Sequence, residues 1–492
     1  MKFQTRRTIC NDGGNVRFMP KRVYEPENLE QIQDIVRTAE SEGVRVRAIG
    51  SLHSYSDAAK TRGFAIMPQK LDKILQLDET VLNDGVETDT LVHVQSGVRL
   101  RELNDWLADQ NLALPNMGGY DEQTVAGATA TSTHGSGIEF GPLTEMIQSV
   151  ELVSDNGALY RIEPENGITN PAEFIQKFPD WHLVQNDDWF NAVIVGMGCM
   201  GIFYSLIIKV IPKYWLKEVR TLSTWKEVKA ALQRSDVLRE NRHWEVIFNP
   251  HKVKGENLCL ITTRNPVQKP RKLPPDKKNR NFLPEFGASI PFIWRISGWI
   301  FKLFPKFSPK LVNSAIKGLE DDGYTNISYK VLNIGTANKV KALSSEIALP
   351  MKNNSYLDAV EKFLEMAAEN ASFRKFHTAP VSLRFVKASA AHLSPQQENT
   401  CMMEIIFLKD TPGAPEMLGE YEKELYADSG RPHMGQFNVL TPERIEEMYP
   451  RFHAWQHVNE QLNANGTFNN SFSDRVFGTE DHEFQSQELE RV

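Results

Sequence analysis

Hydrophobic and polar positions repeat with two different periods along the first 212 residues of this chain. Over residues 29–39, apolar side chains recur every three or four positions, which predicts a helix that ends at Gly43. Over residues 44–48, apolar and polar side chains alternate, which predicts a strand. A strand over 92–97 and a helix over 100–107 follow, so helices and strands are mixed in this part of the chain.

Helices and strands continue to alternate up to residue 212, where the first predicted domain ends. Short alternating runs flank Asp155-Asn156-Gly157, which predicts a β-hairpin, and a strong strand over 203–211 closes an α+β domain of residues 15–212. A second domain is predicted from residue 213. Its first helix spans 224–234, because Thr224 and Glu227 have the spacing of a capping box. Two strands follow, at 244–248 and 258–263.

Residues 269–317 differ from the rest of the chain. They carry eleven Lys or Arg residues against two acidic ones, together with the aromatic apolar runs 290–294 and 299–304. The favoured interpretation is a pair of amphipathic helices that packs on its own domain. The alternative is peripheral docking of residues 290–304 on an anionic membrane surface.

Composition narrows the class of protein. The chain has 492 residues, 41% hydrophobic and 24% charged, with a net charge of −7, which argues against a partner nucleic acid. The four cysteines (Cys10, Cys199, Cys259 and Cys401) lack the spacing of a metal site or a disulfide framework, so no metal is expected. No signal peptide and no spanning apolar run is visible. These features predict a cytoplasmic protein.

Two loops of small residues form the candidate cofactor site. The first is residues 47–56, which contain His53, and the second is residues 127–137. Little side chain covers their backbone N–H groups, so these groups could converge on a pyrophosphate, although no GxGxxG motif follows the first strand. His53 could attack an activated methyl group of a flavin ring, or it could be an ordinary hydrogen-bonded loop histidine.

These segments resemble a known family. Ile49-Gly50-Ser51-Leu52-His53-Ser54, Gly127-Ala128 and Thr133-His134-Gly135-Ser136-Gly137 resemble the FAD-binding domain of the vanillyl-alcohol oxidase superfamily, and more narrowly the sugar-1,4-lactone and alditol oxidases. The resemblance extends over nearly the whole chain. Further matching segments are 196–202, 431–435, 449–452, 465–468 and 475–478.

The resemblance implies a fold and a cofactor. It implies an α+β fold: a two-lobed FAD-binding domain, a substrate (cap) domain over 213–440 with a large antiparallel sheet, and a segment 441–492 that returns to the FAD domain. It also implies FAD bound covalently through an 8α-histidyl bond to His53. The FAD contacts that it implies are Ala48, Ile49, Gly50, Ser51, Leu52, His53, Ser54, Gly118, Thr124, Gly127, Ala128, Thr133, His134, Gly135, Ser136 and Ile202.

The chain departs from this family at the expected catalytic positions. The lactone and alditol oxidases have a Glu-x-Arg pair on a strand and a Lys in a His-Trp-Gly-Lys turn. Here Ser382 precedes Arg384, and the turn runs from His433 to Gln436 without the Trp or the Lys. The catalytic candidates are Ser382, Arg384, His433 and Gln436. His433 either handles a proton or hydrogen-bonds the flavin edge. Glu404 is either a pocket carboxylate or a paired structural one.

Because Ser382 replaces the Glu of the family, we expect Arg384 to be freer to pair with a substrate anion or the reduced flavin. This replacement also predicts a less charged site, less suited to a polyol. The function that follows is oxidation of a CH–OH group of a sugar lactone or related alcohol, by hydride transfer to flavin N5 and then to O2 or another acceptor. The alternatives are a sterol-like apolar alcohol as substrate, a flavin reductase or cyclase, and a binding protein that has lost catalysis.

Overall fold

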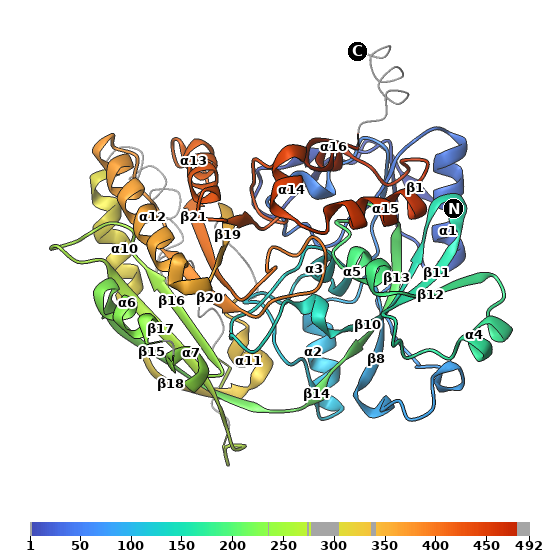
Figure 1. Ribbon diagram of the computed structural model, residues 1–492, viewed down its shortest axis with the longest axis horizontal. Coiled ribbons are helices and arrows are strands. Elements are labelled where there is room, and N and C mark those ends of the chain that lie inside the picture. The colour runs from blue at the N-terminus through green and yellow to red at the C-terminus, as the bar shows by residue number, and fades with distance from the viewer. Residues whose placement is uncertain (1, 235, 273–274, 277–304, 336–340, 480–492) are drawn as a thin grey trace, which may run out of the picture.

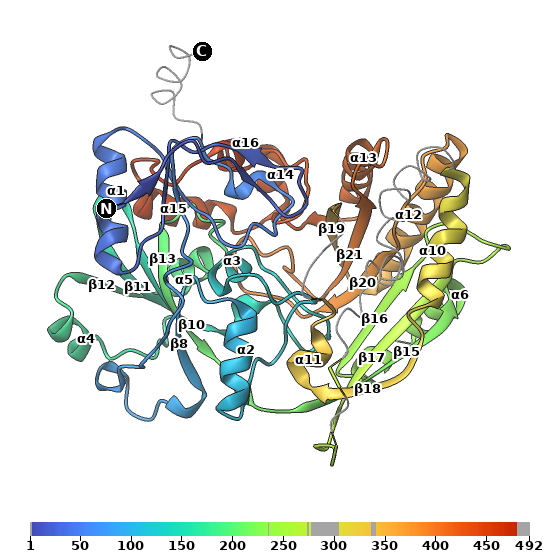
Figure 2. The ribbon, with the colours of Figure 1, turned by 180° about the vertical axis from the view of Figure 1, so that it is seen from behind.

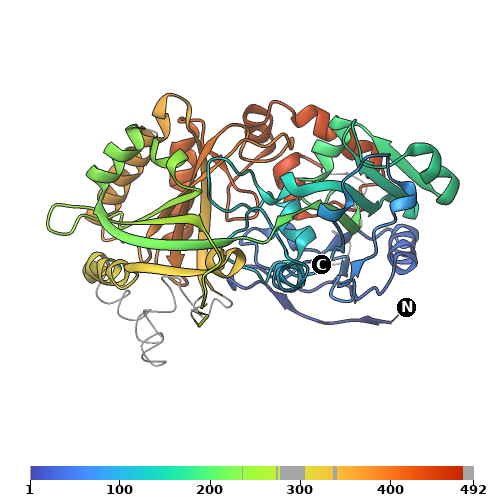
Figure 3. The same cartoon turned by 90° about the horizontal axis from the view of Figure 1, so that it is seen from below.

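The computed structural model describes residues 2–234, 236–272, 275–276, 305–335 and 341–479 (Figure 1). The segment predicted to contact a membrane, 290–304, lies outside these ranges. The molecule is elongated, with one large sheet and its helices at one end and two smaller sheets at the other (Figure 3). Within the described ranges, no helix has both the length and the apolar character needed to cross a bilayer.

A four-stranded sheet occupies the N-terminal part of the chain. Its strand order is β1 (Phe3–Gln4), β4 (Arg22–Tyr24), β6 (Phe64–Ile66) and β5 (Val46–Ala48). The helix α1 (Leu29–Ser41) connects β4 to β5 and buries Ile32, Val36 and Ala39, so the predicted helical face is confirmed. Asn28 begins the helix, because its side chain accepts a hydrogen bond from Gln31 N.

A six-stranded sheet follows. Its order is β12 (Trp181–Gln185), β11 (Leu159–Glu163), β10 (Ile147–Val153), β13 (Ile202–Lys209), β8 (Leu91–Gln95) and β7 (Ile74–Leu75). Strands β10 and β11 form the predicted hairpin, with Val153 opposite Leu159. Asn156 and Gly157 turn the chain with φ values of 59° and 71°, conformations that these two residue types adopt at low cost.

An eight-stranded antiparallel sheet forms the other end of the molecule (Figures 1 and 2). Its order is β18 (Asp321–Ile327), β15 (Trp215–Thr224), β17 (Leu258–Val267), β16 (His243–Phe248), β20 (Val381–Val386), β21 (Thr400–Leu408), β19 (Ala342–Pro350) and β22 (Arg431–Pro432). This is the large antiparallel sheet that the resemblance implies, and the predicted fold class is confirmed.

Side chains alternate between the two faces of this sheet. One face packs on α6 (Trp225–Gln233), α12 (Ser355–Ser372) and α13 (Ala414–Tyr426), and it contributes Leu383 of β20, Met403 of β21 and Ile347 of β19 to an apolar core. The neighbouring residue on each strand therefore points to the opposite face. That face carries Arg384, Glu404 and Glu346, and it borders the candidate site.

The C-terminal helices return to the N-terminal part of the chain, as Figure 1 shows in red beside blue. They are α14 (Pro442–Met448), α15 (Phe452–Leu462) and α16 (Ser471–Phe477). Val46 N donates to Thr467 O at 2.7 Å, and Arg45 pairs with Asp474 at 2.7 Å. The division of the chain at residues 212 and 440 stays a prediction.

The remaining elements connect these sheets. They are β2 (Ile9–Cys10), β3 (Arg17–Phe18), α2 (Leu100–Asp109), β9 (Leu112–Ala113), α3 (Val125–Ala130), α4 (Pro171–Lys177), α5 (Asp187–Val193), β14 (Ile211–Pro212), α7 (Asp236–Glu240), α10 (Ser308–Lys317) and α11 (Ser328–Leu332). The predicted capping box at the start of α6 is present, with reciprocal bonds between Thr224 and Glu227.

Candidate active site

A first cavity lies where three loops of small residues meet, and it has about 1150 Å³ of empty volume, including its opening to solvent. Residues 47–54 and 123–131, which overlap the predicted loops 47–56 and 127–137, form two of these loops, and the third spans 197–203. Ten of the residues predicted to contact FAD line this cavity: Ala48, Gly50, Ser51, Leu52, His53, Ser54, Thr124, Gly127, Ala128 and Ile202. The two loops therefore lie together although some eighty residues separate them.

Gly50 and Gly127 bring the two loops close to each other. A Cβ atom on Gly50 would lie 2.7 Å from Thr124 Oγ1, and one on Gly127 would lie 2.8 Å from the same atom. Thr124 precedes α3, and its Oγ1 accepts a hydrogen bond from Gly127 N at 3.2 Å. Because both glycines lack a side chain, the wall of the cavity is bare backbone, which suits a flat group that carries phosphates.

Arg47 is buried and ties the segments around this cavity together. Its guanidinium donates to the backbone oxygens of Ala58 at 2.7 Å, Gly198 at 2.9 Å and Phe468 at 3.0 Å. These three carbonyls belong to distant parts of the sequence. Sequence reasoning missed this role. A charged residue inside the otherwise apolar strand β5 is the signal that could have indicated it.

A second cavity of about 1300 Å³, including its opening to solvent, adjoins the first, and the two share His53, Ser54, Gln123 and Thr131. His53 is partly exposed, and its Nδ1 lies 3.4 Å from Asp12 Oδ2. Besides His53 and Ser54, the second cavity is lined by all four catalytic candidates and by three further residues predicted to contact FAD. These seven are Ser382, Arg384, His433, Gln436, Gly118, Thr133 and His134.

Three residues predicted to contact FAD line neither cavity; each makes a contact within the protein, and its contact with FAD stays a prediction. Ile49 is fully buried in an apolar cluster, and its N–H donates to Ile66 O. A Cβ on Gly135 would lie 2.4 Å from both Asn116 Oδ1 and Met117 O, so close packing explains this glycine. Ser136 Oγ donates to Trp244 O at 2.9 Å.

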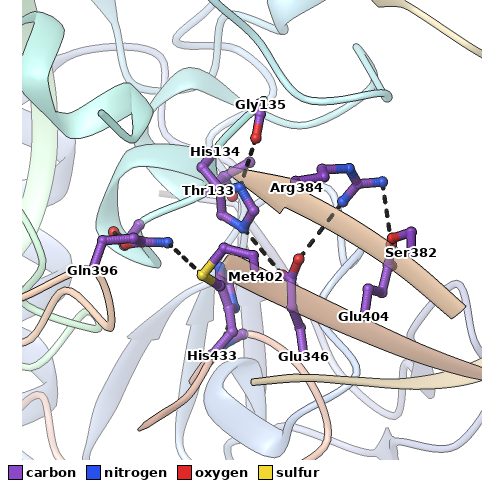
Figure 4. A network of polar contacts seen from close by, with 12 residues as sticks. Thr133, His134, Gly135, Glu346, Ser382, Arg384, Gln396, Met402, Glu404 and His433 are labelled. Atoms are coloured by element: carbon purple, nitrogen blue, oxygen red, sulfur yellow. Dashed lines mark hydrogen bonds and ion pairs between the residues drawn. The ribbon is translucent and has the colours of Figure 1, made fainter. Parts of the chain in front are cut away.

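A buried chain of alternating charges runs along one wall of the second cavity (Figure 4). His134 Nε2 lies 3.2 Å from Glu346 Oε2, Glu346 Oε1 lies 3.6 Å from Arg384 Nη1, and Arg384 Nη2 lies 3.2 Å from Glu404 Oε2. His134, Glu346 and His433 hold ligand-type atoms within 4.8 Å of one another. The hydrogen bond of Glu346 to His134 and its contact with the Arg384 cation account for this grouping without a metal ion.

The two ring nitrogens of His134 both face oxygen acceptors. Nδ1 lies 2.8 Å from Gly135 O, and Nε2 faces Glu346. Burial by itself would raise the pKa of Glu346, but its contacts with His134, with a contribution from Arg384, lower that pKa to about 2. Glu346 is therefore an ionised carboxylate between His134 and the Arg384 cation.

His433 is buried in the same wall and is neutral at neutral pH. Desolvation lowers its pKa to about 4, although the charge of Glu346 partly opposes this. Gly435 N donates to His433 Nδ1 at 3.1 Å, so Nδ1 is unprotonated and the proton lies on Nε2. The predicted role of His433 in proton transfer stays a prediction.

Arg384 keeps a carboxylate partner although residue 382 is a serine. The prediction of a less charged site is therefore wrong. Glu404 of the neighbouring strand forms an ion pair with Arg384 and accepts a hydrogen bond from Ser382 Oγ at 3.2 Å. Both interpretations of Glu404 hold together, because it is a paired carboxylate that also lines the cavity. Glu346 was not singled out from the sequence at all.

Two further polar groups face the second cavity. Gln436 Oε1 is buried and has no hydrogen-bond partner among the described residues, as expected of an acceptor that awaits a bound molecule. Burial, and then the charge of Glu404, raise the pKa of Tyr55 above its ordinary value, so its hydroxyl stays protonated. The bare glycine wall of the first cavity and this unpaired acceptor in the second fit a flavin nucleotide beside a polar substrate.

Comparison with known proteins supports this assignment. Residues 20–163 match the family model of the FAD binding domain, and residues 206–476 match the model of D-arabinono-1,4-lactone oxidase. The chain is 27% identical to L-gulonolactone oxidase of Mus musculus over 470 residues, which are 93% of this chain and 95% of that protein. It is 25% identical to L-gulono-1,4-lactone dehydrogenase of Mycobacterium tuberculosis over 93% of this chain and 96% of that one.

Among solved structures, the fold is similar to that of cholesterol oxidase from B. sterolicum. The TM-score is 0.76 at 13% identity, with 96% of each chain covered, and this likeness shows the fold alone. The fold and the two adjoining cavities define an FAD-dependent oxidoreductase that acts on CH–OH donors. The chain belongs to the D-arabinono-1,4-lactone oxidase family, whose model matches more than half of its residues.

Proposed function

We propose that this protein oxidises a CH–OH group of a sugar 1,4-lactone, with FAD attached covalently to His53 and with O2 or another acceptor taking up the electrons. The observation that carries the proposal is that His53 borders both cavities. A flavin attached there would lie with its nucleotide against the glycine loops and its ring facing the second cavity. Bound FAD supplies the acceptor for the hydride that leaves the CH–OH carbon.

The residues of the second cavity suit a hydroxyl-rich substrate. Arg384 donates hydrogen bonds but cannot accept them, Glu404 accepts them, and Tyr55 can do both. The Arg384 cation also stabilises negative charge that develops in this cavity during hydride transfer. Glu346 and Glu404 hold it in place, so little reorganisation is needed at the moment of reaction.

An apolar sterol-like alcohol is not favoured as substrate. Binding it would strip water from the charged groups Arg384 and Glu404 without new hydrogen bonds, at a cost of several kcal/mol. The fold likeness to cholesterol oxidase does not alter this, because the residues of the cavity decide the substrate. A protein that has lost catalysis is likewise not favoured, since the cofactor loops and the charged wall are both complete.

Turnover of defined substrates tests the proposal. The purified protein is supplied with L-gulono-1,4-lactone, D-arabinono-1,4-lactone, an alditol and a sterol, and both peroxide formation and reduction of an electron-accepting dye are followed. We expect saturable turnover with at least one lactone and none with the sterol. Peroxide identifies O2 as the acceptor, whereas dye reduction alone identifies a dehydrogenase. Turnover of the sterol in preference to every lactone would overturn the proposal.

We further propose that the protein acts in the cytoplasm, and we keep peripheral membrane contact of residues 290–304 as the alternative to packing of this segment on its own domain. All four cysteines are unpaired, and three of them are buried, which suits a reducing compartment. Sedimentation with anionic liposomes at low salt tests the membrane contact. Protein that stays in the supernatant at every lipid concentration would rule the contact out.

A further inference from the structure

We propose that Glu404 is the carboxylate that binds the substrate hydroxyls, acting as a pair with Arg384. This inference rests on the proposed function and names the specificity-determining residue of that site. Ser382 and Glu404 are direct cross-strand partners in the antiparallel pair of β20 and β21. Residues so paired have Cβ atoms about 4.5–5.5 Å apart on the same face of a sheet. A carboxylate on β21 therefore reaches much of the space that one at position 382 would occupy.

Its contacts hold the Glu404 carboxylate at the cavity wall. Oε2 accepts from Ser382 Oγ at 3.2 Å and lies 3.2 Å from Arg384 Nη2, while Oε1 accepts a long hydrogen bond from Ser344 Oγ at 3.4 Å. An ionised carboxylate has about four lone-pair positions, and these contacts use three of them. The side chain is 16% exposed, in a cavity of the right size for a small molecule. One acceptor position thus remains for a ligand.

The other carboxylates that line this cavity already have partners within the protein. Among the described residues, Asp12, Glu346 and Glu404 are the acidic side chains that line it. Glu346 is only 4% exposed and is engaged by His134 and Arg384. Asp12 faces His53 at 3.4 Å, where the two cavities adjoin. Glu404 is therefore the carboxylate best placed to accept a hydrogen bond from a substrate hydroxyl.

The pair of Glu404 and Arg384 defines a substrate class. The carboxylate accepts a hydrogen bond and the guanidinium donates one, so together they match two neighbouring hydroxyl groups, each of which can do either. A molecule with a single hydroxyl can bridge the two groups, but it makes fewer hydrogen bonds with them than two neighbouring hydroxyls do. The pair should therefore favour polyhydroxy lactones and alditols over simple secondary alcohols.

The test compares Glu404→Gln with wild type on a lactone and on a monohydroxy secondary alcohol. Glutamine keeps the shape and can still accept from Ser382, but it loses the charge. Because hydrogen bonds to charged groups are the stronger ones, we expect kcat/KM for the lactone to fall by about ten- to a hundredfold. The value for the simple alcohol should fall by a smaller factor, because a single hydroxyl makes fewer hydrogen bonds with the pair. Flavin content should match that of Glu420→Gln, an exposed control on α13, whereas Tm should fall below that of the control because Arg384 loses an ion-pair partner.

Two more variants separate binding from a structural role. Glu404→Asp keeps the charge on a shorter side chain and should retain more lactone activity than Glu404→Gln. The exchange variant S382E/E404S returns the carboxylate to β20 and should recover most of the lost activity. Equal losses on both substrates, or a folded exchange variant with no recovery, would show that Glu404 only supports the fold around Arg384.

A binding measurement keeps this inference distinct from the proposed function. Perturbation of the flavin absorbance during titration with an alditol reports binding without turnover. If the wild type oxidises no lactone, the proposed function fails. Weaker alditol binding by Glu404→Gln would then still support the hydroxyl-binding role, and unchanged binding would overturn it.

Discussion

Glu346 shows how much of this site depends on a single buried carboxylate. It lies between the imidazole ring of His134 and the guanidinium of Arg384, and it comes from β19, far from either in sequence. Removing one member of a buried ion pair typically costs about 3–5 kcal/mol, because the remaining charge is left uncompensated. Glu346 therefore acts by positioning His134 and Arg384.

Replacement of His53 tests the covalent attachment of the flavin. In His53→Ala we expect the flavin to leave the protein on acid denaturation, so that the precipitated polypeptide is colourless, whereas the wild-type polypeptide stays yellow. The other lining residues of the first cavity are unchanged, so FAD should still bind without a covalent bond.

His453→Ala is the matched control for this variant, because the His453 side chain is 76% exposed on α15. Its precipitate should remain yellow. Flavin that still resists acid in His53→Ala would show that another residue forms the covalent bond.

The residues that sequence reasoning found and missed differ in a physical way. His53, Ser382, Arg384, His433 and Gln436 lie in local motifs, and all five line the cavities. The missed acidic partner, Glu346, has no local motif of its own. Which strand lies next to which, and in what register, decides that it faces Arg384, and neither can be read from one strand.

At the scale of the elements, the loop that follows β5 and the start of α3 form one unit. Small residues in both loops predicted a cofactor site, and the structure adds the reason for the glycines. Gly50 and Gly127 leave no room for a Cβ beside Thr124. Close packing against Asn116 also explains the glycine at position 135, and its contact with FAD stays a prediction.

Gly50→Ala and Gly127→Ala test this unit. Each Cβ would lie under 3.0 Å from Thr124 Oγ1, so the Thr124 side chain or the backbone beside it must shift. We expect a loss of about 1–3 kcal/mol in the free energy of unfolding, as for other overpacked sites, together with reduced flavin content. Urea denaturation and the ratio of flavin to protein absorbance measure the two effects.

Gly419→Ala serves as the control for the glycine variants. A Cβ there would meet Val439 at an ordinary 3.5 Å, and the residue lies inside the helix α13. Alanine is the better helix former, so this variant should be as stable as wild type or slightly more so, with full flavin content. Full flavin content in both Gly50→Ala and Gly127→Ala would refute the close approach of the loops.

At the scale of the whole molecule, the chain closes on itself through its C-terminal segment. α13 carries Glu422, a buried carboxyl that accepts hydrogen bonds from Val439 N at 3.0 and 3.1 Å. Burial raises its pKa from 4.5 to about 7, although this hydrogen bond and the charge of Arg475 oppose the shift. The folded protein therefore binds a proton here that the unfolded chain has already lost between pH 5 and 7.

The sign of the pH effect follows from this difference. Stability from a group with a raised pKa is fully present below the unfolded pKa and is lost as pH rises through the folded pKa. Glu422 should lower the free energy of unfolding by about 3 kcal/mol between pH 5 and pH 8, since each pKa unit corresponds to about 1.4 kcal/mol. Glu422→Gln should remove this part of the pH dependence.

Urea denaturation at pH 5 and pH 8 measures the effect as a difference between variant and wild type, so other titrating groups cancel. Glu420→Gln, on the exposed side of the same helix, should keep the wild-type pH dependence. A Glu422→Gln variant with that same dependence would mean that Glu422 is ionised in the folded protein at pH 5.

Anaerobic reduction of the flavin tests the central claim most directly, since it reports hydride transfer from the second cavity without any electron acceptor. The purified holoenzyme is mixed with a sugar 1,4-lactone in the absence of O2, and the flavin absorbance is followed. We expect the absorbance to bleach at a rate that saturates with lactone, and bleaching to be strongly slowed in Arg384→Ala. A flavin that is attached to the protein yet stays oxidised with every lactone and alditol would contradict the account.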